Sequence, residues 1–188
     1  MNNENDSFSD KTLINDVLRG NTQAFASVVK NTERLVAQIV CKMIVNEEDQ
    51  KDIVQEIYLK TYQKLATFKF QSKLSTWIAN IAYNTTVNYL EKKKIPLSSI
   101  DSVTENKYSN FENIETEILN KEKIQALNKE INNLSPIYKT LISLYHIEEL
   151  SNKEISKITS LPEGTIKNYL YRARKILKDN LNNNYQIF

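Results

Sequence analysis

Three acceptor-rich side chains cluster at helical spacing in the first third of the sequence. Asp52, Gln55 and Glu56 occupy positions i, i+3 and i+4, so they share one face of a helix. They lie beside the apolar residues Ile53 and Ile57, not among them. Carboxylate and amide oxygens placed this way suit the guanidinium groups of a partner protein. The spacing therefore predicts a protein-binding surface, although by itself the cluster is better explained as a solvated acidic face.

Asparagines at four-residue spacing mark a second chemical surface. Asn80, Asn84 and Asn88 form a polar stripe opposite the side of the helix that carries Trp77. An amide both donates and accepts hydrogen bonds at a base edge. Aromatic rings that could stack on bases and lysines that could hold a phosphate backbone lie nearby: Phe68, Phe70, Trp77, Tyr83, Lys69, Lys73, Lys92, Lys93 and Lys94. As alternatives, Trp77 fits the core better than a stacking role, Phe68 fits either role, and the last three lysines could simply solubilise a helix end.

A basic segment near the C-terminus is the third surface. Residues 165–178 hold five basic residues and no acid, a net charge of +5. Residues 151–154 read Ser-Asn-Lys-Glu, a capping box that begins a short helix, and residues 160–164 form a turn before a basic helix. This order is the layout of a helix-turn-helix, in which early residues reach base edges and later basic residues reach phosphates. The outward residues assigned to duplex DNA are Glu163, Thr165, Lys167, Asn168, Tyr171, Arg172, Arg174, Lys175 and Lys178. An ordinary basic surface helix is the alternative.

The composition excludes several classes of protein. With one His and one Cys, the chain has almost no material for a metal cluster or a disulfide framework. We interpret Cys41 as a core residue and His146 as a helix residue near a turn. No nucleophile elbow, HExxH motif or phosphate-binding loop is present. We therefore expect no enzyme, no metal and no cofactor. No apolar run approaches the ~20 residues of a membrane span, and no signal peptide is visible, so we expect a cytoplasmic protein without membrane insertion.

The chain is predicted to be all-α. Among 188 residues there are only two Gly and three Pro, while 40% are hydrophobic, and apolar residues recur at helical spacing. Helices are expected from Ser9 or Asp10 as N-cap to Gly20, then over 22–46, 47–66 and 75–93. Others are expected from 114 to 134, from 136 to about 145 and from 152 to 159. A last helix is expected to follow the turn at 160–164 and to run to about Asp179. The Asn-rich tail after that residue is expected to fray.

Charge and periodicity divide the chain into two small helical domains. We expect one domain over 1–94, a flexible linker over 95–113 where periodicity fails, and a second domain over 114–188. Residues 47–56 hold five acids and one lysine (net −4), and residues 60–94 hold seven lysines and one acid (net +6). Residues 98–118 again hold five acids and one lysine (net −4). Alternating charge of this kind suggests separate surfaces for polyanions and for cations.

Two long motifs resemble one bacterial family. LSNKEISKITSLPEGTIKNYLYRARKIL resembles both region 4 of bacterial sigma factors and the DNA-binding domain of LuxR-type regulators. DQKDIVQEIYLKTY resembles sigma region 2.2, and FKFQSKLSTWIANIAYNTTVNYLEKKK resembles regions 2.3 and 2.4. Together the similarities cover most of 11–94 and 122–178. The chain is thus identified as a member of the sigma-70 family, in the minimal two-domain extracytoplasmic-function (ECF) group.

The resemblance implies three binding surfaces. Asp52, Gln55 and Glu56 would bind the β′ clamp helices of core RNA polymerase, and region 4 would meet its β flap. Region 4 would bind −35 duplex DNA. Melted −10 DNA would be bound by Lys69, Phe70, Gln71, Ser72, Lys73, Asn80, Tyr83, Asn84 and Asn88. The loop departs from the family pattern, since Phe70, Gln71 and Leu74 replace its usual Gly, acid and aromatic.

The resemblance also implies further partners, and two competing functions remain open. An anti-sigma factor is expected, and the acidic segment 98–118 would extend toward the polymerase active-site channel. A LuxR-type regulator would instead bind intact duplex without polymerase. A helical scaffold or inhibitor would have no DNA role at all.

Overall fold

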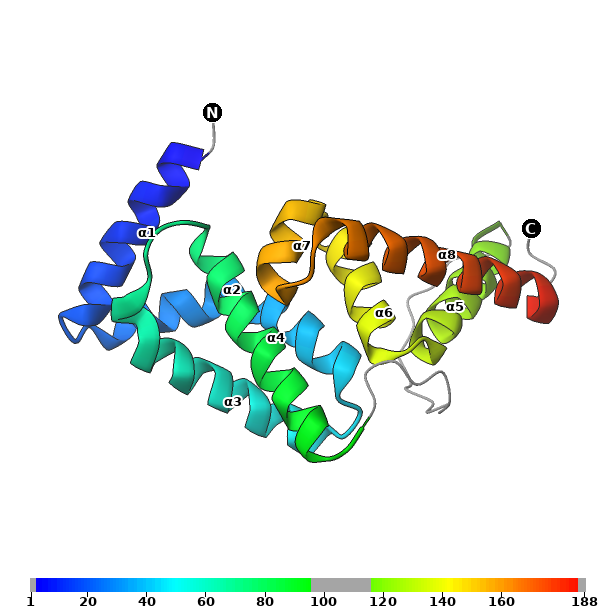
Figure 1. Ribbon diagram of the computed structural model, residues 1–188, viewed down its shortest axis with the longest axis horizontal. Coiled ribbons are helices and arrows are strands. Elements are labelled where there is room, and N and C mark those ends of the chain that lie inside the picture. The colour runs from blue at the N-terminus through cyan, green and yellow to red at the C-terminus, as the bar shows by residue number, and fades with distance from the viewer. Residues whose placement is uncertain (1–2, 96–115, 186–188) are drawn as a thin grey trace.

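The computed structural model describes residues 3–95 and 116–185, and every regular element within those ranges is a helix (Figure 1). The N-terminal helices are α1 (Asn3–Leu18), α2 (Thr22–Met43), α3 (Glu47–Lys64) with a 3₁₀ turn η1 (Leu65–Thr67), and α4 (Leu74–Lys92). The C-terminal helices are α5 (Thr116–Asn133), α6 (Pro136–Ile142) with a π-helical turn η2 (Ser143–Ile147), α7 (Asn152–Thr159) and α8 (Glu163–Tyr185). The all-α prediction is confirmed. The predicted linker, from residue 96 onward, lies outside the described residues.

Side-chain caps begin α2 and α3, and both helices start at the residues that the sequence predicts, Thr22 and Glu47. The Asn21 side chain accepts from the backbone N–H groups of Gln23 and Ala24, and begins α2. Asn46 caps α3 in the same manner through Asp49. The three acids in the first turn of α3 also interact favourably with the positive end of its helix dipole.

Aliphatic side chains from α2, α3 and α4 form the N-terminal core. Ile39, Ile57, Ile78 and Leu90 are almost completely buried, and α4 packs along both α2 and α3. Fully burying a side chain of this size contributes about 1.5–3 kcal/mol. The core therefore fixes the rotation of α3 and α4, and with it the faces that they present to solvent.

The C-terminal core surrounds the two helices of the helix-turn-helix. Ile155 and Ile158 of α7 meet Ile166 and Leu170 of α8, and all four are almost fully buried. The capping box at Ser151 forms as predicted, with Ser151 and Glu154 bonded to each other in both directions. α6 packs beneath α8, and α5 lies along its distal half.

Three helix ends differ from the sequence prediction. α2 was expected through residue 46 but ends at Met43. α1 begins at Asn3, and Asp10 lies within it instead of capping it. α8 continues through the tail that was expected to fray and ends at Tyr185. The reason is burial, because Leu181 is 4% exposed. In addition, the amides of Asn180 and Asn184 donate to the buried carboxylate of Glu130 in α5.

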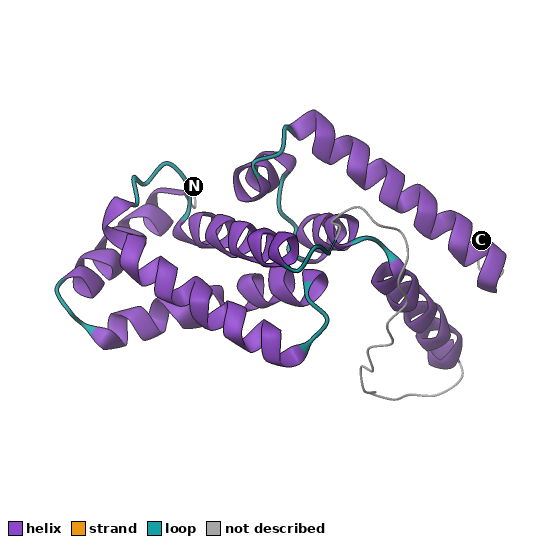
Figure 2. Cartoon of the chain, turned by 60° about the horizontal axis from the view of Figure 1, so that its bottom comes forward, coloured by secondary structure: helices purple, strands orange, loops and turns teal. Residues whose placement is uncertain are grey.

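The two domains pack against each other. α7 lies against α4, and α6 lies against α2, so the orange and yellow helices meet the N-terminal bundle in Figure 1. Seen from a second direction, the N-terminal bundle lies on one side and α8 extends away on the other (Figure 2). The sequence predicted two independent modules on a tether, and the direct contact between them is a correction to that expectation.

Candidate nucleic-acid interface

The acidic cluster on α3 faces solvent. Asp52, Gln55 and Glu56 are all exposed, and Glu56 forms an i,i+4 ion pair with Lys60 at 2.6 Å. Leu59 follows on the same face and is 58% exposed. An exposed leucine between polar neighbours supplies the apolar contact that protein interfaces need at their centre. Sequence reasoning missed Leu59, although its spacing from Gln55 and Glu56 was the available signal.

Aromatic side chains shape the loop between η1 and α4. Phe68 is 7% exposed and its ring lies 5.3 Å from Trp77 and 4.8 Å from Phe70, measured between centroids. Phe68 therefore belongs to the core, and Trp77 is half-buried against it. Phe70 is 40% exposed, with the ammonium of Lys11 5.6 Å from its ring centroid. Its φ of 56° lies in the left-handed region, which glycine adopts freely and which strains a bulky residue.

A cavity of about 330 Å³ opens beside this loop. Its walls come from the loop and from the polar side of α4: Thr67, Phe68, Lys69, Gln71, Ser72, Thr76, Trp77, Asn80, and Lys157 of α7. The volume falls in the range of small-ligand pockets, about 300–1,000 Å³. Aromatic walls, hydroxyls, an amide and lysines give it the chemistry to receive a flat, polar heterocycle.

The asparagine stripe forms on α4 but its members differ in exposure. Asn84 and Asn88 are exposed, whereas Asn80 is half-buried. The Asn80 amide donates to the backbone carbonyls of Lys157 (3.1 Å) and Ile158 (2.8 Å), and accepts from Asn84 (3.2 Å). The stripe thus has hydrogen-bonding capacity, part of which is engaged by α7.

Tyr83 does not face solvent with the other predicted −10 residues. It is 7% exposed, and burial together with Tyr169 of α8 raises its pKa to about 12. Its ring therefore lies in packed surroundings between the domains, where no DNA can reach it in this arrangement.

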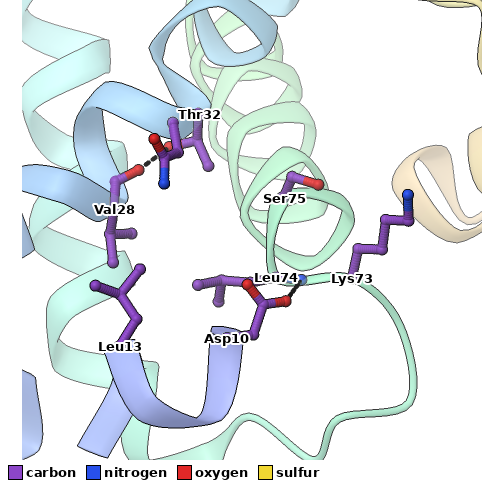
Figure 3. Close-up of a pocket in the computed structure, with 8 residues that line it drawn as sticks. Asp10, Leu13, Val28, Thr32, Lys73, Leu74 and Ser75 are labelled. Atoms are coloured by element: carbon purple, nitrogen blue, oxygen red, sulfur yellow. Dashed lines mark hydrogen bonds between the residues drawn. The ribbon is translucent and has the colours of Figure 1, made fainter. Parts of the chain in front are cut away.

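The start of α4 is held by a residue from another helix. The carboxylate of Asp10 accepts from the backbone N–H of Leu74 at 3.1 Å, and thereby caps a helix whose own N-cap residue makes no such bond (Figure 3). A second cavity of about 290 Å³ lies here, and Asp10, Leu13, Thr32 and Leu74 are among its walls (Figure 3). This cap fixes where the loop ends and α4 begins.

The predicted duplex-binding residues form one open surface on α8. Thr165 is half-buried and all the others are exposed, with Tyr171 reaching 63%. Tyr171 was assigned to base contact, and a ring this exposed is free to make one. The structure therefore brings the −35 set together, keeps the α3 set together, and divides the −10 set between covered and open positions.

The described residues contain no group of three or more His, Cys, Asp or Glu that could hold a metal ion. Cys41 was expected in the core, but it is exposed and its thiol bonds to Gln50 at 3.3 Å. None of the helices within residues 3–95 and 116–185 has the length and hydropathy to cross a membrane.

Comparisons with known proteins place both domains in one family. The model of sigma-70 region 2 matches residues 28–95, and the model of sigma-70 region 4 matches residues 124–177. The ECF RNA polymerase sigma factor SigW of Bacillus subtilis is 29% identical over 179 residues, covering 91% of this chain and 96% of that protein. The ECF sigma-E factor of Escherichia coli K12 is 29% identical over 177 residues, covering 90% and 92%.

Solved structures share the fold. The sigma factor RpoE of Bartonella quintana, solved with the anti-sigma factor NepR, has a TM-score of 0.64 at 21% identity, covering 84% of this chain and 96% of that one. CnrH, solved with the cytosolic domain of CnrY, has a TM-score of 0.63 at 19% identity, covering 93% and 98%.

Proposed function

The chain belongs to the sigma-70 family, in its extracytoplasmic-function group, and we propose that this transcription initiation factor reads its promoter through the α4 face and the α8 surface while α3 binds core RNA polymerase. The observation that carries the proposal is that the chain presents three separate surfaces, each with different side-chain chemistry. An acidic, apolar-centred patch, an aromatic cavity beside an amide stripe, and a basic helix occupy three different faces of one chain.

The cavity beside the loop is proposed to receive a base of the melted −10 element. A base that has left the duplex needs a pocket with stacking surfaces and groups that meet its edge. Phe68 and Trp77 supply aromatic walls, and Gln71 and Asn80 supply polar groups. Lys69, a wall of the cavity, and Lys73, the residue before α4, are proposed to hold the DNA backbone.

The α8 surface is proposed to lie in the major groove of the −35 element. Thr165, Lys167, Asn168 and Tyr171 occupy the first part of the helix, where base edges are reached. Arg172, Arg174, Lys175 and Lys178 follow and suit phosphates. Glu163 begins the helix and would bias which bases are accepted.

The α3 patch is proposed to bind the β′ clamp helices, with Leu59 at its apolar centre. Region 4 is proposed to meet the β flap. In this reading polymerase performs the chemistry and the sigma factor chooses the start site in the cytoplasm, and an anti-sigma factor is an expected partner. A LuxR-type regulator is not favoured, because the region 2 model matches the N-terminal domain as well.

Charge reversal on α3 tests this assignment. We expect Asp52→Lys with Glu56→Lys to abolish co-purification with core polymerase, because two exposed acceptors become cations. Glu33→Lys with Glu91→Lys is the matched control, since both acids are exposed and lie on α2 and α4. Retained polymerase binding by the α3 variant would refute the assignment, as would an equal loss in the control. Run-off transcription with the same holoenzymes reports whether binding is productive.

A further inference from the structure

We propose that the loop before α4 carries a second nucleotide subsite, which lies outside the cavity. The ring of Phe70 receives the base next to the one in the cavity, and Lys11 of α1 binds its phosphate. This inference rests on the proposed role of the cavity in receiving a base of the melted −10 element. It adds α1 to the elements that contact DNA, and it gives the bound strand two stacked bases in place of one.

Phe70 lies outside the cavity and faces solvent. Phe68 and Trp77 are walls of the cavity, and Phe68 is 7% exposed, whereas Phe70 is not a wall and is 40% exposed. The φ of 56° at Phe70 costs energy for a bulky residue, and strain of this kind is commonest at binding sites. An exposed ring on a strained backbone, next to a cavity suited to a base, provides a stacking surface for a second base.

Phe68 joins the cavity to Phe70. Its ring centroid is 5.3 Å from that of Trp77 and 4.8 Å from that of Phe70, so the three rings form one continuous aromatic surface. Stacking on such a surface accepts any base, because every base has a π-face. Neighbouring nucleotides of one strand can therefore place one base in the cavity and the next base on Phe70.

The cap of α4 holds Lys11 beside Phe70. The Asp10 carboxylate accepts from the backbone N–H of Leu74, which ties α1 to the end of the loop (Figure 3). The next residue, Lys11, is exposed, and its ammonium lies over the Phe70 ring, 5.6 Å from the centroid. Stacking of a base is stronger than a cation–π contact at an exposed site. The base therefore takes this face of the ring, and the flexible ammonium turns to the phosphate.

The charge around Phe70 favours a nucleic acid over a protein as the occupant of the ring. Residues 57–90 contain four lysines and no acid. Lys69 and Lys73 are exposed on either side of Phe70 in the sequence, and Lys11 adds an exposed cation from a different element. Cations from two elements around one exposed ring match the alternation of phosphate and base along a single strand.

The test uses the fluorescence of Trp77, which is the single tryptophan of the chain and a wall of the cavity. Quenching of Trp77 reports a base in the cavity, whereas nucleotides bound on the exposed basic residues of α8 do not contact it. The probes are 5′-mononucleotides and 5′-phosphorylated homodinucleotides of each of the four DNA bases, titrated into the full chain. The measured quantity is the ratio of dinucleotide affinity to mononucleotide affinity for the preferred base.

Matched variants separate the ring from the ammonium. Phe70→Leu removes the ring but keeps an apolar side chain, and Phe70→Tyr keeps the ring. Lys11→Gln removes the charge, Lys11→Arg keeps it, and Arg19→Gln removes a charge from an exposed position just after α1. We expect Phe70→Leu to lower the affinity ratio about tenfold and Lys11→Gln to lower it about threefold. Phe70→Tyr, Lys11→Arg and Arg19→Gln should keep the ratio of the unmodified chain.

The double variant Phe70→Leu with Lys11→Gln shows what the lysine contacts. If the ammonium binds a phosphate, Lys11→Gln lowers the affinity ratio in the Phe70→Leu background as well. No further loss there would overturn the phosphate contact, because the lysine would then act only through the ring. An equal fall of the ratio in Arg19→Gln would overturn it too, since the effect would be one of net charge.

A ratio of about one in the unmodified chain would overturn the subsite, as would equal ratios in Phe70→Leu and Phe70→Tyr. Quenching of Trp77 by mononucleotides in the same titrations shows that the cavity binds a base, so these results leave the proposed function standing. Absence of quenching by every mononucleotide would overturn the proposed role of the cavity and the subsite together.

Discussion

The strength of phosphate binding by α8 can be worked out from its exposed cations. The four cations assigned to phosphates, Arg172, Arg174, Lys175 and Lys178, are all exposed. Each phosphate contact adds about −0.9 to the slope of log K against log salt for duplex DNA, so four contacts predict a slope of about −3.6. Arg172→Ala with Arg174→Ala should flatten the slope by about two units and weaken binding to all sequences alike.

The assay uses the free chain, because the basic residues of α8 are exposed and counterion release does not depend on sequence. Anisotropy of a random-sequence duplex across a potassium chloride series gives the slope. Lys123→Ala with Lys129→Ala removes the same charge from exposed positions on α5 and should leave the slope unchanged. Equal slopes in the α8 variant and the unmodified chain would refute phosphate binding by these arginines. An equal change in the α5 control would show a net-charge effect instead.

Four further predictions concern stability. Ser151→Ala should cost about 1 kcal/mol in denaturant unfolding, because the capping box is lost; an unchanged midpoint would contradict the cap. Hydrogen bonds from Ser151 lower the Glu154 pKa below its ordinary 4.5. The stabilisation by Glu154 is therefore fully present above that value and is lost as pH falls through the folded-state pKa. Glu154→Gln should flatten the acid side of a melting-temperature profile, and an identical profile would argue against the linkage. Ser160 has a left-handed φ of 59° at the end of α7, so Ser160→Gly should stabilise by about 0.5–1 kcal/mol, whereas destabilisation would refute strain there. Asp10→Ala should cost about 1 kcal/mol and increase hydrogen exchange at Leu74, since the cap of α4 is removed; unaltered exchange would mean that the bond is not maintained in solution.

Local signals in the sequence were sufficient for most helix boundaries. Asn21, Asn46 and Ser151 act on backbone groups two or three residues away, so each cap could be read from the residues beside it. The α8 surface was predictable for the same reason, since helical spacing separates its buried face from its basic one.

Contacts between distant residues left no such signal. The sequence predicts Asp10 as a possible N-cap of the first helix, yet Asp10 lies within α1 and caps α4, 64 residues later. Asn80 bonds to carbonyls 77 and 78 residues away, and backbone carbonyls carry no residue identity that a pattern could reveal. Lys157 looked like an ordinary basic residue of a short helix until the loop at Gln71 was seen beside it. The packing of α7 against α4 and the loop depends on these long-range bonds, and helical periodicity is insensitive to them.

The buried carboxylate of Glu130 sets the boundary of any excised C-terminal domain. The sigma-70 region 4 match ends at residue 177, yet Glu130 is 2% exposed and relies on amides at positions 180 and 184. A fragment trimmed to the match would leave a buried carboxyl group without the amides that donate to it, a costly situation for folding. Expression clones for isolated DNA-binding studies should therefore extend through Tyr185.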